Sequence, residues 1–267
     1  MRVSPGKVFN RAILAAPVSY KKRHAMDTAQ IAVLLEPFLE RPLLRSQLDQ
    51  ISIYIDLLLR WNARINLTAI RQEEEIVTRH FGESFFLARH LFPGSSDPLH
   101  PDLQPIEEET PAGVHGSTGY WLLRTGNCAP RVLDIGSGAG FPAVPLKLWA
   151  PHIHLTLIES NHKKAVFLRE VARALTLTNI NVIADRLETL VARPGFPRAQ
   201  VVTFRAVERF DAILRQAVAL LAPNATLALL IGVAQLPHLT ALDTLDWRPP
   251  IPVPQSHTRV LSIGVLR

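Results

Sequence analysis

The stretch from Arg131 to Pro142 constrains this chain more than any other feature, because a short apolar run passes directly into closely spaced glycines. The apolar run is partly β-branched, which suits a buried parallel strand, and it consists of Val132, Leu133 and Ile135. The glycines occupy every second position after it, at Gly136, Gly138 and Gly140. Without a Cβ, each glycine lets the backbone turn sharply. We therefore expect a strand that enters a loop where a cofactor can lie against the main chain.

The spacing of the glycines distinguishes between two kinds of cofactor. A dinucleotide fingerprint requires Gly-x-Gly-x-x-Gly, and the position of its third glycine is taken by Phe141. The observed Gly-x-Gly-x-Gly, preceded by Asp134, instead resembles the first motif of the class I S-adenosylmethionine (SAM) methyltransferases. An ordinary connection between a strand and a helix is the structural alternative.

An acidic residue strengthens the interpretation as a cofactor site. A second apolar run, residues 153–158, predicts the next strand, and Glu159 closes it 19 residues after Gly140. A nucleotide-binding sheet places a carboxylate at this point, because a carboxylate accepts hydrogen bonds from both ribose hydroxyls. Strand, glycine loop, helix, strand and acid thus occur in the order that such a site requires.

The rest of the chain predicts an α/β fold. After residue 131, strands predicted at 180–184, 200–204, 225–231 and 258–265 alternate with helices at 161–175 and 212–221. This alternation is typical of a Rossmann-like doubly wound sheet, which binds ligands at the carboxyl ends of its strands. The proline-rich residues 243–254 are hard to assign to any element.

The chain divides into four predicted segments. Residues 1–26 contain six basic side chains and no acid, and we expect a disordered basic arm. Periodicity over residues 27–93 predicts an N-terminal helical region, and residues 121–267 form the predicted SAM-binding methyltransferase domain. Between them, residues 94–120 carry five acids and no Lys or Arg, which indicates a disordered acidic linker. Met26 would make a natural start, so we hypothesise that residues 1–25 are not translated; native peptides from upstream of it would exclude this.

Two residues of the helical region carry specific expectations. Thr68 is placed to cap a helix whose early turns contain the acidic residues 73–75. His80 lies on that helix, and no second histidine or cysteine stands at metal-ligand spacing around it. We therefore expect His80 to be a satisfied interior histidine rather than a metal ligand or base, and we predict no metal site.

Charge and composition limit the class of protein. The net charge of +6 equals the excess of the basic arm. Once the acidic linker is also set aside, the rest is mildly basic and rich in arginine, which permits nucleic acid as a partner. The single cysteine, Cys128, cannot form an internal disulfide, which fits the reducing cytoplasm. No apolar run approaches the roughly 20 residues that span a bilayer, so we expect a cytoplasmic protein without a membrane partner.

Several motifs along the chain occur in a fixed order. They are Trp61-Asn62, Asn66-Leu67-Thr68-Ala69-Ile70, His80-x-x-Glu83-Ser84, Asp134 to Pro142, Arg186-Leu187-Glu188 and Arg205-Ala206-Val207. Together they resemble the bacterial small-subunit ribosomal RNA guanine-N7 methyltransferases, also called the glucose-inhibited division protein B family. The resemblance covers roughly residues 51–91 and 131–231. The family pattern at the third motif is His-x-x-Asp-Ser, so Glu83 is a conservative exchange.

The resemblance implies an activity, a cofactor and a substrate. It implies SAM-dependent methylation of N7 of a specific guanine in 16S ribosomal RNA, either free or within the small ribosomal subunit, and we expect a monomer. The implied contacts are Gly136 and Phe141 with the cofactor, Glu159 with its ribose, Leu187 and Glu188 with its adenine, and Arg205 with the pocket or the incoming guanine. Gly138 and Gly140 complete the cofactor loop, and the Asp134 carboxylate would offset positive charge beside the sulfonium.

Each of two implied roles has a structural alternative. Arg205 could form a surface ion pair, and Asp134 could accept hydrogen bonds from loop amides. One departure from the family also affects the expected activity. The family often has Lys-Gly at the end of the fifth strand, where this chain has Ile231-Gly232.

The expected reaction explains which catalytic groups are needed. Guanine N7 offers a lone pair and carries no proton, so no general base is required, and alignment of the reactants supplies most of the rate. Two alternatives stay open: a SAM-binding ribosome-assembly or RNA-binding protein with little turnover, and a methyltransferase that acts on another acceptor. A nicotinamide oxidoreductase is disfavoured by Phe141.

Overall fold

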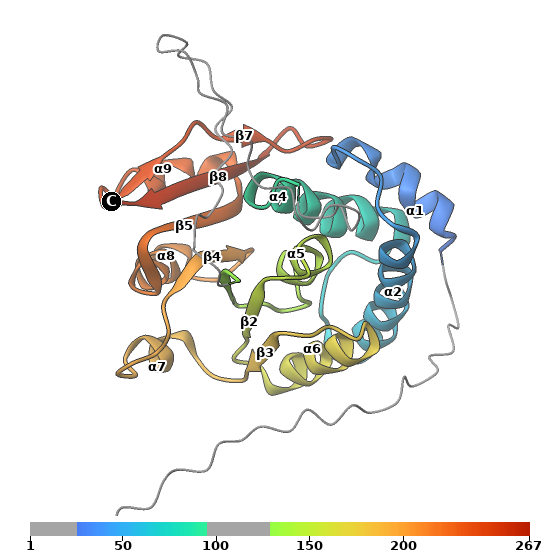
Figure 1. Ribbon diagram of the computed structural model, residues 1–267, viewed down its shortest axis with the longest axis horizontal. Helices are drawn as coiled ribbons and strands as arrows, with labels where there is room; N and C mark the ends of the chain where they lie inside the picture. The colour runs from blue at the N-terminus through green and yellow to red at the C-terminus, as the bar shows by residue number, and fades with distance from the viewer. Residues whose placement is uncertain (1–25, 95–128) are drawn as a thin grey trace, which may run out of the picture.

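The computed structural model describes residues 26–94 and 129–267, and its centre is a single mixed sheet between layers of helices (Figure 1). The strands follow the order β3-β2-β1-β4-β5-β8-β6, and β7 pairs with β8. Their bounds are β1 (Arg131–Ile135), β2 (His154–Ile158), β3 (Ile180–Ile183), β4 (Ala199–Arg205), β5 (Leu221–Gly232), β6 (Leu245–Trp247), β7 (Ile251–Pro252) and β8 (Arg259–Leu266). The predictions for the basic arm, the acidic linker and Cys128 concern residues that lie outside the described ranges.

The strand directions confirm the predicted Rossmann-like doubly wound sheet. Strands β1 to β5 pair in parallel, whereas β8 runs antiparallel to β5. The strand order reverses at β1, since β2 and β3 lie on one side of it and β4 on the other. A reversal of this kind opens a crevice beyond the carboxyl ends of the strands, where open α/β sheets bind ligands. The topology therefore directs the search for a site to the ends of β1, β2 and β4.

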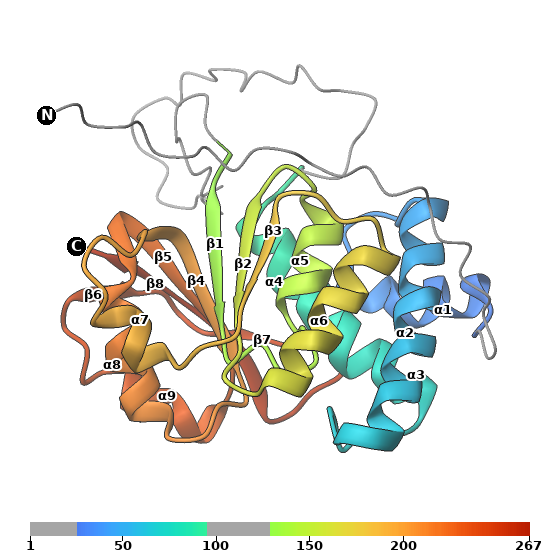
Figure 2. The ribbon, with the colours of Figure 1, turned by 90° about the horizontal axis from the view of Figure 1, so that it is seen from below.

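Helices cover both faces of the sheet (Figure 2). One face carries α5 and α6 next to the sheet together with the helices of the N-terminal region, and the other face carries α7, α8 and α9. The N-terminal elements are α1 (Thr28–Leu35), η1 (Glu36–Phe38), α2 (Arg45–Ile65), α3 (Glu73–Glu75), the π-helical η2 (Ile76–Gly82) and α4 (Glu83–Leu91). The others are α5 (Ala143–Trp149), α6 (His162–Ala174), α7 (Leu187–Val191), α8 (Phe210–Ala219), η3 (Val233–Gln235) and α9 (Leu236–Leu239).

The N-terminal helices share a hydrophobic core with one face of the sheet. On α2, the apolar side chains recur at spacings of three and four residues, and Ile51, Ile55 and Leu58 are all buried, as the periodicity predicts. The same core contains Val132 of β1 and Leu157 of β2. The predicted helical extension is thus confirmed, and it packs on the sheet through a continuous core.

The structure corrects the sequence analysis at three places. Thr68 does not cap the helix that begins at Glu73, because its hydroxyl is engaged with the amide of Ile70 and the ring of His80. The fifth strand begins at Leu221 rather than 225, directly after α8. The proline-rich residues 243–254 form β6 and β7, which exist because both pair with β8. Pairing of this kind depends on tertiary structure, and no local pattern in the sequence predicts it.

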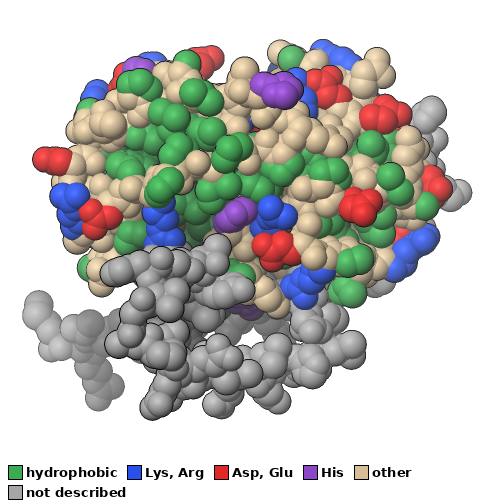
Figure 3. All heavy atoms as spheres, turned by 90° about the horizontal axis from the view of Figure 1, so that it is seen from above, with side chains coloured by type: hydrophobic (Ala, Val, Ile, Leu, Met, Phe, Trp, Pro, Cys, Tyr) green, Lys and Arg blue, Asp and Glu red, His purple; other side chains and the backbone are tan. Residues whose placement is uncertain are grey.

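The surface adds one limit on the kind of partner. Figure 3 shows hydrophobic side chains across the middle of one face, with basic and acidic side chains interspersed around them. The visible part of this face therefore carries no patch of a single sign that would suit a polyanion. Within the described ranges, no helix is both long and apolar enough to cross a bilayer.

Candidate functional site

A pocket of about 470 Å³ lies where the strand order reverses. This volume falls within the roughly 300–1,000 Å³ typical of sites for small ligands. Four of the predicted site residues line it, namely Gly136, Glu159, Leu187 and Glu188. The ends of β1 and β2 and the turns after β3 and β4 supply the walls, so the pocket occupies the crevice that the topology indicated.

The glycine turn forms the part of the wall that follows β1. Gly136, Gly138 and Gly140 all have positive φ, at 65°, 54° and 88°, which disfavours any residue with a Cβ. The turn is fixed to β2, because the amides of Gly136 and Ser137 both donate to the carbonyl of Ile158, at 2.8 and 3.1 Å. A Cβ on Gly136 would lie 3.1 Å from Cγ1 of Val207, on the opposite wall. The missing side chain therefore keeps the space between the glycine turn and Val207 open.

Glu159 links the glycine turn to the helix that follows β2. Its Oε2 accepts from the amide of Gly138 at 2.8 Å, and its Oε1 accepts from the amide of Asn161 at 2.7 Å. The Asn161 side chain in turn accepts from the amides of Lys163 and Lys164 and caps α6. Each carboxylate oxygen can accept more than one hydrogen bond, so Glu159 retains acceptor capacity toward the pocket.

The far wall of the pocket is polar and charged. Asp185 follows β3, and its Oδ1 accepts from the amide of Arg186 at 2.8 Å while its Oδ2 lies 3.3 Å from Arg193. The carboxylate of Glu188 forms an exposed ion pair with Arg209 at 3.1 Å. Leu187, between these two acids, is buried. This wall offers a buried apolar side chain flanked by hydrogen-bonding groups, which suits a flat heterocycle.

Asp134 lies behind the glycine turn and has no exposed surface. Neither of its carboxylate oxygens has a hydrogen-bond partner among the described residues. Burial, with a smaller contribution from the neighbouring Glu159, raises the pKa of Asp134 to about 7, although the nearby Ser137 hydroxyl opposes the shift. The predicted structural alternative, acceptance from loop amides, therefore finds no hydrogen bond that supports it here.

Phe141 sits between two other rings and does not line the pocket. Its ring stacks on Tyr54 of α2 with centroids 5.3 Å apart and on His80 of η2 with centroids 4.7 Å apart. The Tyr54 hydroxyl also donates to the carbonyl of Ala139 within the glycine turn. Aromatic contacts of this kind stabilise beyond the area they bury. The N-terminal helices thus hold the glycine turn from behind.

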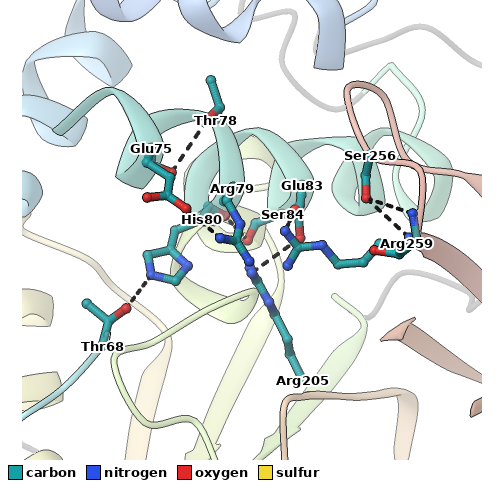
Figure 4. Close-up of polar contacts among 11 residues, drawn as sticks. Thr68, Glu75, Thr78, Arg79, His80, Glu83, Ser84, Arg205, Ser256 and Arg259 are labelled. Atoms are coloured by element: carbon teal, nitrogen blue, oxygen red, sulfur yellow. Dashed lines mark hydrogen bonds and ion pairs between the residues drawn. The ribbon is translucent and has the colours of Figure 1, made fainter. Parts of the chain in front are cut away.

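Arg205 leaves the end of β4 on the face that carries the N-terminal helices. Figure 4 shows its side chain directed at Glu83 of α4, and one guanidinium nitrogen lies 3.2 Å from the Glu83 carboxylate. The other Glu83 oxygen lies 2.7 Å from Arg259 of β8. The side chain of Arg205 is only 10% exposed, so this ion pair is buried and not the surface pair considered from the sequence. Burial lowers the pKa of Arg205 to about 10, with Glu83 opposing the shift.

His80 borders the same cluster and is neutral. Burial lowers its pKa to about 3, and the nearby Arg205 and Arg79 add to the effect. Its Nε2 lies 2.8 Å from the Thr68 hydroxyl, whereas the buried Nδ1 has no hydrogen-bond partner in the described part of the chain. The predicted interior histidine is thus only half satisfied. No group of three or more His, Cys, Asp or Glu among the described residues could hold a metal ion.

The structure brings together some of the predicted residues and separates others. Asp134, Gly138, Gly140, Phe141 and Arg205 do not line the pocket; the first four support the glycine turn, and Arg205 joins the Glu83 cluster. Asn161 and Asp185 line the pocket but were not among the predicted site residues, although each stands within three residues of the end of a strand, which was an available signal. The sequence analysis also missed Tyr54, Arg79 and Arg259, for which no local pattern exists.

The chain also matches known proteins. Residues 47–97 and 120–245 match the profile of the family described as rRNA small subunit methyltransferase G. This chain belongs to that family. A protein named ribosomal RNA small subunit methyltransferase G from Chloroflexus aggregans is 37% identical over 182 residues, which cover 67% of this chain and 62% of that protein.

Two further relatives carry the same name. The protein from Chromobacterium violaceum is 32% identical over 65% of this chain and 66% of its own length. The protein from Bacillus subtilis is 30% identical over 62% of this chain and 56% of its own length. The matched region thus spans less than two thirds of each of these three relatives. Family membership and the sheet topology together confirm the predicted class I methyltransferase fold.

The residue at the predicted departure from the family is a core residue. Ile231 is 4% exposed and packs with Phe204 and other apolar side chains on the face that carries α8 and α9. The position is therefore occupied by an apolar side chain that contributes to packing rather than by a cation.

Proposed function

We propose that this protein transfers a methyl group from SAM to N7 of a specific guanine in 16S ribosomal RNA. The observation that carries the proposal is the pocket at the strand reversal, where the glycine turn and Glu159 meet in a member of this family. We further propose that it acts in the cytoplasm, as a monomer, on free RNA or on the small ribosomal subunit.

The residues of the pocket fit SAM part by part. The Glu159 carboxylate would accept from the ribose hydroxyls, since its position after β2 is the one that nucleotide-binding sheets use. Leu187 would contact the adenine face, with the backbone at Glu188 beside its edge. Gly136 leaves room for the methionine part of SAM, because a side chain at this position would fill the space in front of Val207. SAM supplies an electrophilic methyl group on a sulfonium.

The chain itself supplies alignment and charge. Buried Asp134 lies behind the glycine turn, and its anionic form would stabilise a sulfonium nearby. Since guanine N7 carries no proton, no side chain has to remove one. The protein would hold N7 in line with the methyl group and exclude water, and well-aligned reactions of this kind gain up to about 7–11 kcal/mol. We propose that Arg205 serves the RNA side of the site, because its side chain leaves β4 away from the pocket.

The test is methyl transfer from labelled SAM to small ribosomal subunits that lack this modification, with deproteinised 16S RNA in parallel. We expect label on guanine N7, and hydrolysis followed by chromatography of the nucleosides identifies the labelled base. Label on another base or on a protein would contradict the proposal and favour a different acceptor. Arg205→Ala should strongly reduce methyl transfer while the variant remains folded, as its melting temperature shows. A collapsed melting temperature that accompanies an equal loss of transfer would count against this role.

The second candidate is a SAM-binding protein of ribosome assembly with little turnover. It is favoured by Ile231, since an apolar core residue stands where the family often has lysine. SAM binding by calorimetry without label on either substrate would support this candidate over the first.

A further inference from the structure

Three arginines from distant parts of the sequence converge beside the pocket. Arg79 lies on η2, Arg205 ends β4 and Arg259 begins β8, and Figure 4 shows all three side chains around Glu83. Glu83 lies 3.2 Å from Arg205 and 2.7 Å from Arg259. Burial lowers the pKa of Arg205, Glu83 opposes this shift, and the charges of Arg259 and Arg79 add to it. The sheet and the N-terminal helices together create this cluster.

The acidic groups in the cluster do not balance its positive charge. Glu83 is the buried carboxylate, and its two oxygens are shared between Arg205 and Arg259. Arg79 pairs with Glu75, an ion pair in which both side chains are more than 40% exposed. His80 contributes no charge near neutral pH. Three guanidinium groups therefore face two carboxylates, and an excess of positive charge next to buried groups is unfavourable without a further anion.

Hydrogen-bonding capacity is also unused. The side chain of Arg205 is 10% exposed, and its buried Nη1 has no hydrogen-bond partner among the residues described. The buried Nδ1 of His80 also lacks a hydrogen-bond partner among these residues. If the Thr68 hydroxyl donates to Nε2, then Nδ1 carries the proton and is a donor too. A buried donor without a partner destabilises the folded protein, so the retention of these donors indicates an acceptor that binds here.

We propose that Arg79, Arg205 and Arg259 form a binding subsite for a phosphate group of the RNA substrate. Guanidinium groups match a phosphate in shape and charge and bind it through paired hydrogen bonds. The ligand would enter from the side of Arg79 and Arg259, whose side chains are 45% and 21% exposed, and reach the donors of Arg205 behind them. Glu83 positions Arg205 and Arg259 so that both face the phosphate.

The place of the subsite fits an RNA substrate, and in this respect the inference rests on the proposed function. Ala206 and Val207, which directly follow Arg205, line the cofactor pocket. One residue of strand spans only about 3.3 Å. A nucleotide that presents its base to the pocket would therefore bring a phosphate of its own backbone near the cluster. Contact with the phosphate would fix the register of the RNA without reading its sequence.

The first experiment tests the subsite without RNA. Line broadening of the ³¹P resonance of inorganic phosphate is measured with the full chain and with Arg79→Gln, Arg259→Gln and Arg267→Gln. Arg267 is the matched control, because it is 61% exposed, ion-paired with Asp246, and follows the opposite end of β8. We expect broadening with the wild type and Arg267→Gln, and at least a fivefold loss with the other two variants. Equal broadening by all four proteins would overturn the proposal.

The second experiment identifies the source of the phosphate. Binding to unmodified small ribosomal subunits is measured across a range of salt concentrations. Loss of one phosphate contact lowers the slope of log K against log salt by about 0.7–0.9. We expect this change, with a five- to tenfold higher KM for subunits and unchanged SAM affinity, for Arg79→Gln and Arg259→Gln only. Arg79→Lys should recover much of the slope, since it restores the charge.

The outcomes separate this inference from the proposed function. Methylation by the wild type with no effect of either variant on phosphate or RNA would refute the subsite and leave the function intact. Loss of phosphate binding in the variants, from a protein that methylates no ribosomal substrate, would refute the function and leave an anion site. If Arg259→Gln does not fold, the more exposed Arg79→Gln decides.

Discussion

Asp134 is a buried acid whose protonation is linked to stability. Its pKa is about 7 in the folded protein, against 3.8 for an unperturbed aspartate. Between these two pH values the folded state retains a proton that the unfolded chain has released. Stability therefore falls as the pH rises from about 4 to 7, and the loss is complete above pH 7. His80 acts in the opposite direction, because its pKa of about 3 means that stability falls as the pH drops below 6.5.

Replacement of Asp134 with Asn isolates the contribution of the aspartate. The amide is neutral at every pH, so the variant should lack the decline between pH 4 and 7, while the effect of His80 is common to both proteins and cancels. Denaturant unfolding at several pH values measures the difference. We expect the free energy of unfolding of Asp134→Asn, relative to that of the wild type, to rise by up to a few kcal/mol between pH 4.5 and pH 8. Each pKa unit corresponds to about 1.4 kcal/mol. A difference that does not change with pH would contradict the raised pKa.

Gly140 is required by sterics as well as by its backbone conformation. It has a φ of 88°, and a Cβ there would meet the Tyr54 hydroxyl and lie 3.0 Å from Cγ2 of Val144. We expect Gly140→Ala to destabilise the protein by about 2–4 kcal/mol in denaturant unfolding. Gly195 is the matched control, because its φ is 75° but nothing lies within 4 Å of a Cβ there. Gly195→Ala should cost about 1 kcal/mol, and equal costs would mean that the contact with Tyr54 is unimportant.

At the scale of elements, the glycine turn depends on the helices that pack behind it. Tyr54 of α2 and His80 of η2 enclose the ring of Phe141, and Phe81 contacts that ring edge-on with centroids 5.0 Å apart. The turn faces the pocket with its backbone, whereas its one large side chain faces these rings. The packing of the N-terminal helices on Phe141 should therefore affect the affinity for the cofactor, although these helices do not line the pocket.

Phe141→Leu tests this support. The smaller, unstacked side chain should loosen the turn and weaken SAM binding by about tenfold, because displacement of a site by a fraction of an ångström is costly. Isothermal calorimetry, at a temperature where the variant is folded, measures the affinity. Phe92→Leu is the control, since Phe92 is as buried as Phe141, at 6% and 7% exposed, but lies at the end of α4. Unchanged SAM affinity in Phe141→Leu would show that the stack serves stability alone.

The sequence predicted the elements whose signal is local. The strand before Gly136, the helix predicted at 161–175 and the acid at Glu159 were all evident from runs and spacings within 30 residues. The site also depends on contacts that no such pattern contains. Tyr54 bonds to Ala139 across 85 residues, and Arg205 meets Glu83 only because α4 packs across the end of β4. Glu83 was recognised from its motif, but its partners follow from the tertiary fold.

At the scale of the whole molecule, the N-terminal helices and the sheet form one structural unit. Buried hydrogen bonds connect them at several points: Gln47 of α2 donates to the carbonyl of Leu148 at 2.7 Å, and Trp149 donates to the carbonyl of Phe92 at 2.9 Å. Every residue of α5 is buried between α4 and the sheet. Separation of the two parts would expose this shared core, which opposes independent unfolding.

We therefore expect a single cooperative unfolding transition, in which the calorimetric and van't Hoff enthalpies agree. Native-state hydrogen exchange locates the unit more closely. The slowest amides of α2 and of β4 should exchange with the same free energy, within about 1 kcal/mol, because both open only in global unfolding. The short peripheral α9 is the internal control and should open at a lower free energy. If α2 opened several kcal/mol below β4, the N-terminal helices would be a separate unit, and the arginine cluster between them and the sheet would be a mobile interface.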